Sequence, residues 1–322
     1  VQRMAQLSTL FVLLGLYVYL RARPRWAARG AGSGEVLATG LWLLLCTALA
    51  ALSKENGALL PWLLLVVEVC FFAGCWNGRQ SPLLRSMAWC ALSLPALLLV
   101  ALYLQSPDWL LRGYGTRGFG LDERLLTQGR LLWQYLGWIV WPDVSQYGVH
   151  HDDIVLSTGL WQPLSTGLAL LAWIAALAGP LLLRRRCPLL LFTLLFYLVG
   201  HAMESTLWPL MLVFEHRNYL PSVGVFLLIA WLLSVPFRDG RLANPALPGA
   251  AVSALLLVLL FLRASLWGDE TSLARVGVEN HPQSSRSHYV YANVLLRQYQ
   301  ALPAGGGARA QAREQLVAAR YH

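Results

Sequence analysis

Residues 201–224 read HAMESTLWPLMLVFEHRNYLPSVG and gather two Glu, two His, one Arg, one Asn and one Tyr between long apolar runs. This concentration stands out because only 13% of the 322 residues are charged. Ionisable side chains at the edge of a membrane are costly to place, and they therefore indicate function by default. We interpret this stretch as one half of an active site.

The composition predicts an all-α polytopic membrane protein. Hydrophobic residues make up 57% of the chain and the mean hydropathy is +0.52, whereas soluble domains carry about 25% charged residues. Several apolar runs approach the roughly 20 residues that cross a hydrocarbon core. The net charge of +9 comes from arginines in short loops between these runs, which favours membrane orientation over nucleic-acid binding.

Four arginine-rich loops predict how the spans are oriented. We expect about eight spans, at residues 4–20, 36–52, 58–75, 87–104, 160–183, 188–200, 220–237 and 246–262. Arginines follow the first, third, fifth and seventh spans, at 21–29, 79–85, 184–186 and 238–241. By the positive-inside rule these loops are cytoplasmic, which places the polar clusters on the outer face. The amphipathic stretch 125–141 is then expected in or on the outer interface.

From Gly268 the composition changes to that of a soluble helical segment. We expect helices at 269–280, 284–300 and 308–321, separated by Pro282 and by the linker ALPAGGGAR. The pair SRSHYVYANVLLRQY and AREQLVAARY resembles one tetratricopeptide helix hairpin, so further repeats are expected beyond His322. The predicted domains are a membrane domain at 1–266 and the start of an outer-side repeat domain at 267–322. Because the chain begins at Val1 without Met or a signal-peptide pattern, we also expect membrane helices upstream.

The block from Glu215 to Tyr219 is the first group of candidate site residues. Its Arg217 guanidinium can bind phosphate oxygens bidentately, with His216 and Asn218 beside it. The alternative is an ordinary helix start, in which Glu215 pairs with Arg217 and Tyr219 anchors the interface.

Two further groups offer ionisable side chains. His201 and Glu204 stand one helical turn apart and could act as base and orienter or as ligands of a weak metal site. The alternative is a mutual hydrogen bond at a helix end. Lys54 and Glu55 form a compact polar turn in which Lys54 could bind a phosphate that Glu55 orients, although ordinary solubility would select the same pair.

Metal binding has less support. The run His150-His151-Asp152-Asp153 has suitable residue types, but neighbours on an extended chain point in opposite directions, which favours a solvated outer loop. The five cysteines lack CxxC spacing, so neither a disulfide framework nor a zinc site is indicated. A glycine-rich loop at 113–120 carries Arg117 and could close over an anionic substrate, which is a weak signal.

Four blocks of this chain, taken in order, resemble a known family. They are VQRMAQLSTLFVLLGLYVYLRAR (1–23), LSKENGALLPWLLLVVE (52–68), FEHRNYLPSVGVFLLIAW (214–231) and WGDETSLARVGVENHPQSSRSHYVYANVL (267–295). The blocks are similar to those of the transmembrane and tetratricopeptide-repeat O-mannosyltransferases and their bacterial relatives, which in turn resemble the wider GT-C glycosyltransferases. The resemblance spans nearly the whole chain.

The resemblance implies sugar transfer from a polyprenyl-phosphate-linked donor to a protein acceptor recruited by the repeats. Matched to the family's blocks, the substrate-binding residues would be Arg3, Lys54, Glu55, Glu215, His216, Arg217, Asn218 and Tyr219, with His201 added from the residues themselves. The family's catalytic acid lies in the first outer loop, which here would precede Val1. Within the chain only Glu204 and Glu215 are candidates for it, and we assign both to substrate binding. No cofactor is implied beyond the donor, and a metal requirement is left open.

The predicted mechanism is attack of an acceptor hydroxyl on the anomeric carbon, with Lys54, Arg217 and Arg3 stabilising the departing lipid phosphate. Two other functions stay open: an O-antigen ligase or polymerase-like enzyme that accepts a glycan, and a non-enzymatic scaffold that anchors repeats. Lys54 is the only Lys among the basic residues, which is typical of a GC-rich genome. We therefore expect a bacterial inner membrane, with the site and the repeats on the periplasmic side.

Overall fold

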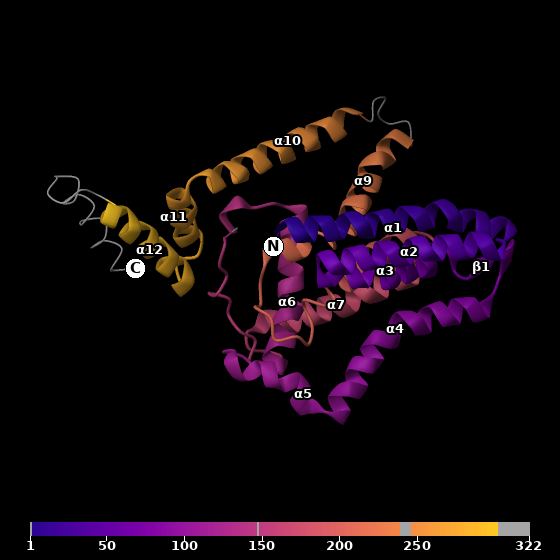
Figure 1. Ribbon diagram of the computed structural model, residues 1–322, viewed down its shortest axis with the longest axis horizontal. Coiled ribbons are helices and arrows are strands. Elements are labelled where there is room, and N and C mark those ends of the chain that lie inside the picture. Colours follow the sequence, from indigo (N-terminus) through magenta and orange to yellow (C-terminus); the bar gives the residue numbers. More distant parts are fainter. Residues whose placement is uncertain (1, 147, 239–245, 302–322) are drawn as a thin grey trace. The chain divides into compact units, whose positions relative to one another are not determined.

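The computed structural model describes residues 2–146, 148–238 and 246–301, and these residues are mostly helical (Figure 1). They divide into two compact units. Unit 1 comprises 1–140, 156–211 and 215–231, and unit 2 comprises 141–155, 212–214 and 232–322. The expected boundary near residue 267 stays a prediction.

Among the described residues, six helical segments are long and apolar enough to cross a membrane, which indicates an integral membrane protein. They are α1 (Gln2–Arg29), α2 (Ser33–Ser53), the segment Glu55–Phe72, α4 (Pro82–Gln105), α7 (Leu164–Leu183) and α10 (Ala246–Ser265). The other two expected spans form the shorter apolar helices α8 (Pro188–His201) and α9 (Ser222–Arg238). The all-α membrane class is therefore confirmed, and α8 and α9 form close to their predicted positions as apolar helices of 14 and 17 residues, shorter than the six of membrane length.

The first arginine-rich segment, residues 21–29, was expected as a loop but is helical. Helix α1 continues through it to Arg29 instead of ending at Leu20. Arg23 is buried and grips both carboxylate oxygens of Glu68, through Nε at 2.8 Å and Nη2 at 2.6 Å. The Tyr19 hydroxyl donates to the same carboxylate at 2.8 Å. A paired and hydrogen-bonded charge can be buried at tolerable cost, so this part of the arginine-rich segment packs on the protein.

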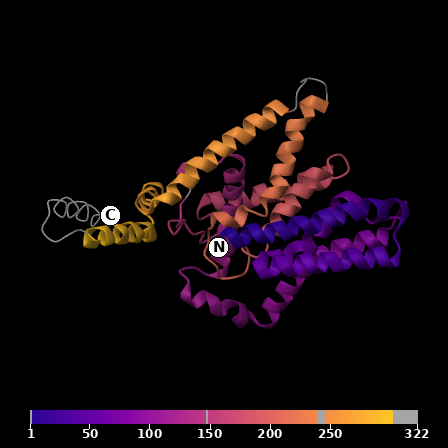
Figure 2. The ribbon, with the colours of Figure 1, turned by 45° about the horizontal axis from the view of Figure 1, so that its top comes forward.

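The core of unit 1 lies where α1, α2, α3 (Leu60–Val67) and α8 meet; α1 and α2 run side by side in both views (Figures 1 and 2). Close approach depends on small residues. A Cβ at Gly57 would lie 2.1 Å from the Ala50 carbonyl carbon, so η1 (Glu55–Leu59) can pack directly on the end of α2 only with glycine there. This packing fixes the turn that carries Lys54.

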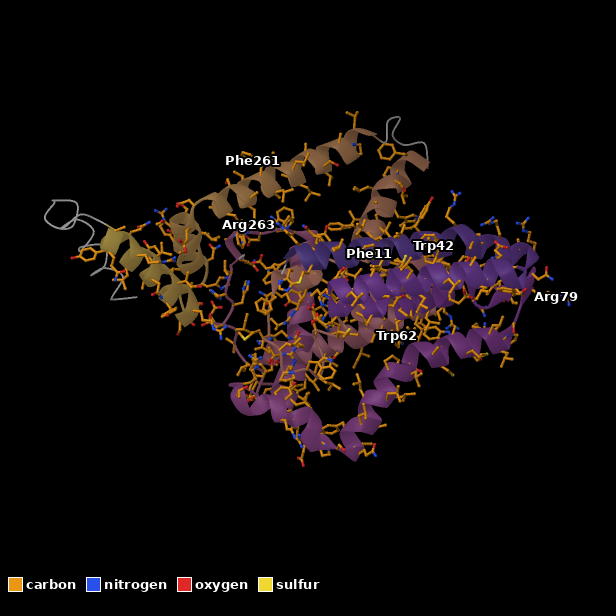
Figure 3. The ribbon with its side chains drawn as sticks, in the orientation of Figure 1. Phe11, Trp42, Trp62, Arg79, Phe261 and Arg263 are labelled. Carbon is orange, nitrogen blue, oxygen red and sulfur yellow. The ribbon has the colours of Figure 1, made fainter. Side chains whose placement is uncertain are left out.

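Basic and polar loops of unit 1 lie at opposite ends of this core. The hairpin of β1 (Cys75–Trp76) and β2 (Arg79–Gln80) joins the end of α1, because Gly78 N donates to Ala27 O at 2.7 Å. Figure 3 places Arg79 at this end. Helix α8 runs antiparallel to α3, with the Phe192 ring tilted against the Phe71 ring near the hairpin, at a centroid distance of 5.3 Å, and with His201 at the other end. The arginine-containing segments 21–29 and 79–85 therefore lie together at one end of the core, whereas the orientation of the spans in a membrane stays a prediction.

Helix α6 (Leu121–Val140) forms where an amphipathic helix was expected, but its polar stripe packs on protein. Arg124, Thr127 and Gln128 are all buried. Trp133 Nε1 donates to Ala169 O and Tyr197 Oη donates to Leu132 O, which attaches α6 to α7 and α8. Preceding it are α5 (Pro107–Leu111) and η3 (Arg112–Thr116).

Unit 2 contains α10, η6 (Leu266–Gly268), α11 (Glu270–Asn280) and α12 (Ser285–Ala301). The apolar side chains of α10 are exposed, as Phe261 illustrates (Figure 3), which suits contact with lipid. Helices α11 and α12 pack together, with Arg297 bonded to Glu270. Both were expected. The third helix, at 308–321, lies outside the described residues, as does the basic residue Arg241.

The segment 150–153 differs from the solvated loop that we expected. His151 is buried against the His281 ring, with ring centroids 4.5 Å apart, and Asp153 pairs with His281 Nδ1 at 3.0 Å. Asp152 accepts a hydrogen bond from the Ser284 hydroxyl. These residues therefore attach an extended segment to the turn between α11 and α12.

Candidate functional site

Three side chains from separate parts of unit 1 meet at the end of the core away from the β1–β2 hairpin. Glu204 Oε1 lies 2.6 Å from Lys54 Nζ, and Glu204 Oε2 lies 4.0 Å from Arg217 Nε. Lys54 follows α2, Glu204 follows α8, and Arg217 lies in η5 (Glu215–Asn218). The sequence predicted these residues as members of three separate groups, and the structure joins them. We call Lys54, Glu204 and Arg217 the ion cluster.

The turn after α2 directs Lys54 into this cluster. Lys54 has an extended backbone conformation, and its N–H still bonds to Ala50 O. Gly57 N in turn donates to Lys54 O at 2.8 Å. Glu55, by contrast, is exposed, which leaves it outside the ion cluster.

The loop that carries Glu204 is held through its backbone carbonyls. The Tyr114 hydroxyl donates to Leu207 O and Arg117 Nε donates to Pro209 O, both at 2.7 Å. The Arg124 guanidinium donates to three carbonyls, those of residues 204, 206 and 210. We call Tyr114, Arg117 and Arg124 the carbonyl clamp. The glycine-rich loop, for which the sequence provides only a weak indication of closure over an anionic substrate, uses Arg117 to hold the protein's own backbone.

Arg124 is the residue that sequence reasoning missed. Its side chain is 0% exposed, and burial, together with the charge of Arg217, lowers its pKa to about 10, against an opposing effect of Tyr114. It therefore stays cationic at neutral pH. Arg124 stands three, four and eleven residues before Thr127, Gln128 and Tyr135, all of them buried. This polar stripe at helical spacing was the available signal, and we interpreted it as facing the membrane interface.

His201 lies between two aromatic rings. Its imidazole stacks on Tyr135, with centroids 5.4 Å apart and planes 6° apart, and meets the Tyr197 ring edge-on at 4.7 Å. Nδ1 lies 3.5 Å from Ser205 Oγ. The mutual His201–Glu204 hydrogen bond that we considered is replaced by the pairing of Glu204 with Lys54.

The remaining candidates of the 215–219 block surround the cluster to different degrees. His216 is half-buried, and burial and the charges of Lys54 and Arg217 lower its pKa, while Glu204 opposes them. Glu215 and Asn218 are half-buried, whereas Tyr219 is 48% exposed. Arg3 is exposed near the start of α1. His216 thus belongs to the electrostatic surroundings of the ion cluster, and the exposed Arg3 has no comparable link to it in the described interactions.

Buried polar atoms without a hydrogen-bonding partner gather at this site in the described part of the chain. They include Asn56 Oδ1 and Glu204 Oε2, whereas the Asn218 side chain forms a hydrogen bond with the His201 imidazole. Buried polar groups are nearly always satisfied by protein or water, so these atoms offer unused capacity to a polar ligand. Among the described residues, no group of three or more His, Cys, Asp or Glu side chains is arranged to hold a metal ion.

Comparison with protein-family models, with curated proteins and with solved structures found no match to this chain.

Proposed function

We propose that this chain is the membrane part of a GT-C-type glycosyltransferase, which moves a sugar from a polyprenyl-phosphate donor to a protein hydroxyl on the periplasmic side. The observation that carries the proposal is the ion cluster. It brings Lys54 and Arg217 to a single carboxylate, Glu204, at the end of a bundle of apolar helices. That end is where the phosphate of a membrane-embedded lipid would lie.

The charge balance of the site favours an anionic ligand. Lys54, Arg217 and Arg124 supply three positive charges against the single negative charge of Glu204, which leaves +2 (3 − 1) among these four residues. Buried cations are stable when they are paired. A phosphodiester between Lys54 and Arg217 would neutralise part of this excess, and a guanidinium can bind two of its oxygens.

The proposed reaction needs little from the protein beyond positioning and charge stabilisation. The acceptor oxygen forms a bond to the anomeric carbon as the bond from that carbon to the phosphate oxygen breaks. The electron pair leaves with the lipid phosphate, where Lys54 and Arg217 stabilise the developing charge. The hydroxyl proton passes to a carboxylate base. Because Glu204 already pairs with Lys54, we assign Glu204 to organising the cations, and Glu215 stays a weaker candidate for the base.

The test compares cells that carry the full-length wild type, Arg217→Ala, Arg79→Met or a deletion. Arg79 is the matched control, because it is an exposed arginine at the opposite end of the core. Intact masses of periplasmic proteins are measured in each strain. We expect a hexose-sized adduct in wild type and Arg79→Met, and its loss in Arg217→Ala and the deletion.

Other outcomes of this experiment identify the competing functions. An unchanged protein profile with altered surface polysaccharide in Arg217→Ala would replace protein glycosylation by a ligase or polymerase reaction on glycans. Wild-type behaviour of Arg217→Ala in both assays, at normal protein level, would support a non-enzymatic anchor for repeats.

A further inference from the structure

The segment of unit 1 that carries Glu204 is held in place by side chains from outside it. Between residues 204 and 210, five backbone carbonyls accept hydrogen bonds from the carbonyl clamp, and three of these five bonds come from Arg124. The segment itself belongs to neither α8 nor η5. Its described backbone hydrogen bonds run from Ser205 N to His201 O and from Leu210 N to Trp208 O, so five of its carbonyls rely on the clamp side chains for a partner.

Arg124 is suited to this task because its guanidinium is planar and donates in several fixed directions. Nη2 bonds to the carbonyl of Glu204 itself at 2.7 Å, and Nε bonds to Thr206 O at 2.8 Å. A lysine at this position would keep the charge but would lose the fork geometry. The segment is also closely packed near the Arg117–Pro209 hydrogen bond, because a Cβ at Gly113 would lie 2.3 Å from Pro209 Cγ. This packing likewise indicates that the segment is held in one position.

We propose that Arg124 is a positioning residue of the site, which fixes the backbone of residues 204–210 and thereby holds the Glu204 carboxylate between Lys54 and Arg217. The inference rests on the proposed function for its kinetic consequence, but its structural part stands without it. Arg124 acts through Glu204, since its own hydrogen bonds end on carbonyl oxygens.

Positioning and phosphate binding predict different kinetics for Arg124. If Arg124 held the donor phosphate, its loss would raise the KM for the donor, and a lysine would restore much of the binding. If it positions Glu204, the charge alone is not enough, because a displacement of about 1 Å in a reacting constellation can cost about 100-fold in rate. We therefore expect Arg124→Lys and Arg124→Met to lower kcat by about 100-fold each, with a donor KM within a few-fold of wild type.

The experiment uses the full-length protein in detergent and four variants. Arg124→Met removes three tethers, Arg117→Met removes the tether to Pro209, and Arg124→Lys keeps the charge. The matched control is Arg130→Met, because Arg130 lies on the same helix and bonds to Ser165 of α7 instead. Transfer kinetics with a synthetic polyprenyl-phosphate sugar are measured beside hydrogen–deuterium exchange of peptides from residues 202–211. Each variant is first checked for a single detergent-solubilised species.

We expect exchange in 202–211 to increase strongly in both Arg124 variants and less in Arg117→Met, while α1, α2 and Arg130→Met match the wild type. Wild-type kcat in Arg124→Lys, or a raised donor KM with unchanged kcat in Arg124→Met, would overturn the positioning role. Unchanged exchange in 202–211 would overturn it as well. If the wild type transfers no sugar, the proposed function fails, and the exchange data alone decide whether Arg124 fixes the segment. Should Arg124→Met fail to yield a soluble species, the comparison of Arg124→Lys with Arg117→Met carries the test.

Discussion

Removing Lys54 should destabilise the protein measurably, because Glu204 would lose the nearer of its two cations. At an effective dielectric constant of about 20, two unit charges attract by about 4 kcal/mol at 4 Å. The same relation gives about 6 kcal/mol for the Lys54–Glu204 separation of 2.6 Å and about 4 kcal/mol for Arg217–Glu204 at 4.0 Å. Desolvation offsets much of both, and breaking a buried pair costs about 3–5 kcal/mol net.

Since Arg217 remains beside Glu204, we expect Lys54→Met to cost about 3 kcal/mol, at the lower end of that range. At about 2–4 °C per kcal/mol, Tm should fall by roughly 6–12 °C. The assay is thermal unfolding in detergent, followed by the fluorescence of the 14 tryptophans. Glu204→Gln and the double variant complete a double-mutant cycle.

The double-mutant cycle can refute the Lys54–Glu204 ion pair. If the two side chains form the pair described here, the double variant is more stable than the sum of the single losses predicts, with a coupling of about 2 kcal/mol. Additivity within about 0.5 kcal/mol would show that they do not interact, and the ion cluster would then lose its central contact. Arg79→Met, an exposed charge at the other end of the core, should leave Tm unchanged.

Three further predictions concern pH, packing and capping. Because burial and nearby cations hold the pKa of His216 below its ordinary value, this imidazole is neutral at pH 7, and a bound phosphodiester raises its pKa. Donor binding then takes up a proton, so the donor KM should fall as the pH is lowered towards and below the ordinary pKa of histidine, and His216→Gln should flatten this dependence. For stability the sign is opposite: the unfolded chain binds this proton more readily, so stability is lost as pH falls through the ordinary pKa of histidine. Gly57→Ala places a Cβ 2.1 Å from the Ala50 backbone and should cost about 1–3 kcal/mol in thermal unfolding, whereas Gly115→Ala, with open space around it, should cost much less. Ser284→Ala removes the hydroxyl that accepts from Ser287 N at the start of α12, and we expect a loss of about 1 kcal/mol and faster amide exchange in 285–290, compared with Ser285→Ala.

The helical class of this chain could be predicted well, because it depends on local composition. Long apolar runs such as those of α2, α4, α7 and α10 predict helices of membrane length by themselves. The extension of α1 to Arg29 could not be read in the same way. It depends on the pairing of Arg23 with Glu68, a residue of another segment, and positive charge in a loop predicts orientation but not packing.

The residues of the candidate site were largely predictable, but their grouping was not. Lys54, Glu204 and Arg217 were each identified from residue type and position near apolar runs. That one carboxylate serves both cations follows from the contact between the end of α2 and the loop after α8, which no local pattern contains. Arg124 was missed because an amphipathic helix shows which residues share a face and not whether lipid, water or protein covers it.

The carbonyl clamp binds backbone carbonyl oxygens, which every amino acid carries. Tyr114, Arg117 and Arg124 donate hydrogen bonds to main-chain oxygens. Most side chains between residues 205 and 210 could therefore be substituted without loss of these hydrogen bonds. Even Pro209, which lacks an N–H, serves as an anchor point. Substitutions can therefore change the side chains of this loop while its backbone conformation is preserved. A protein built in this way can evolve a new recognition surface beside an old ion cluster without having to refold it.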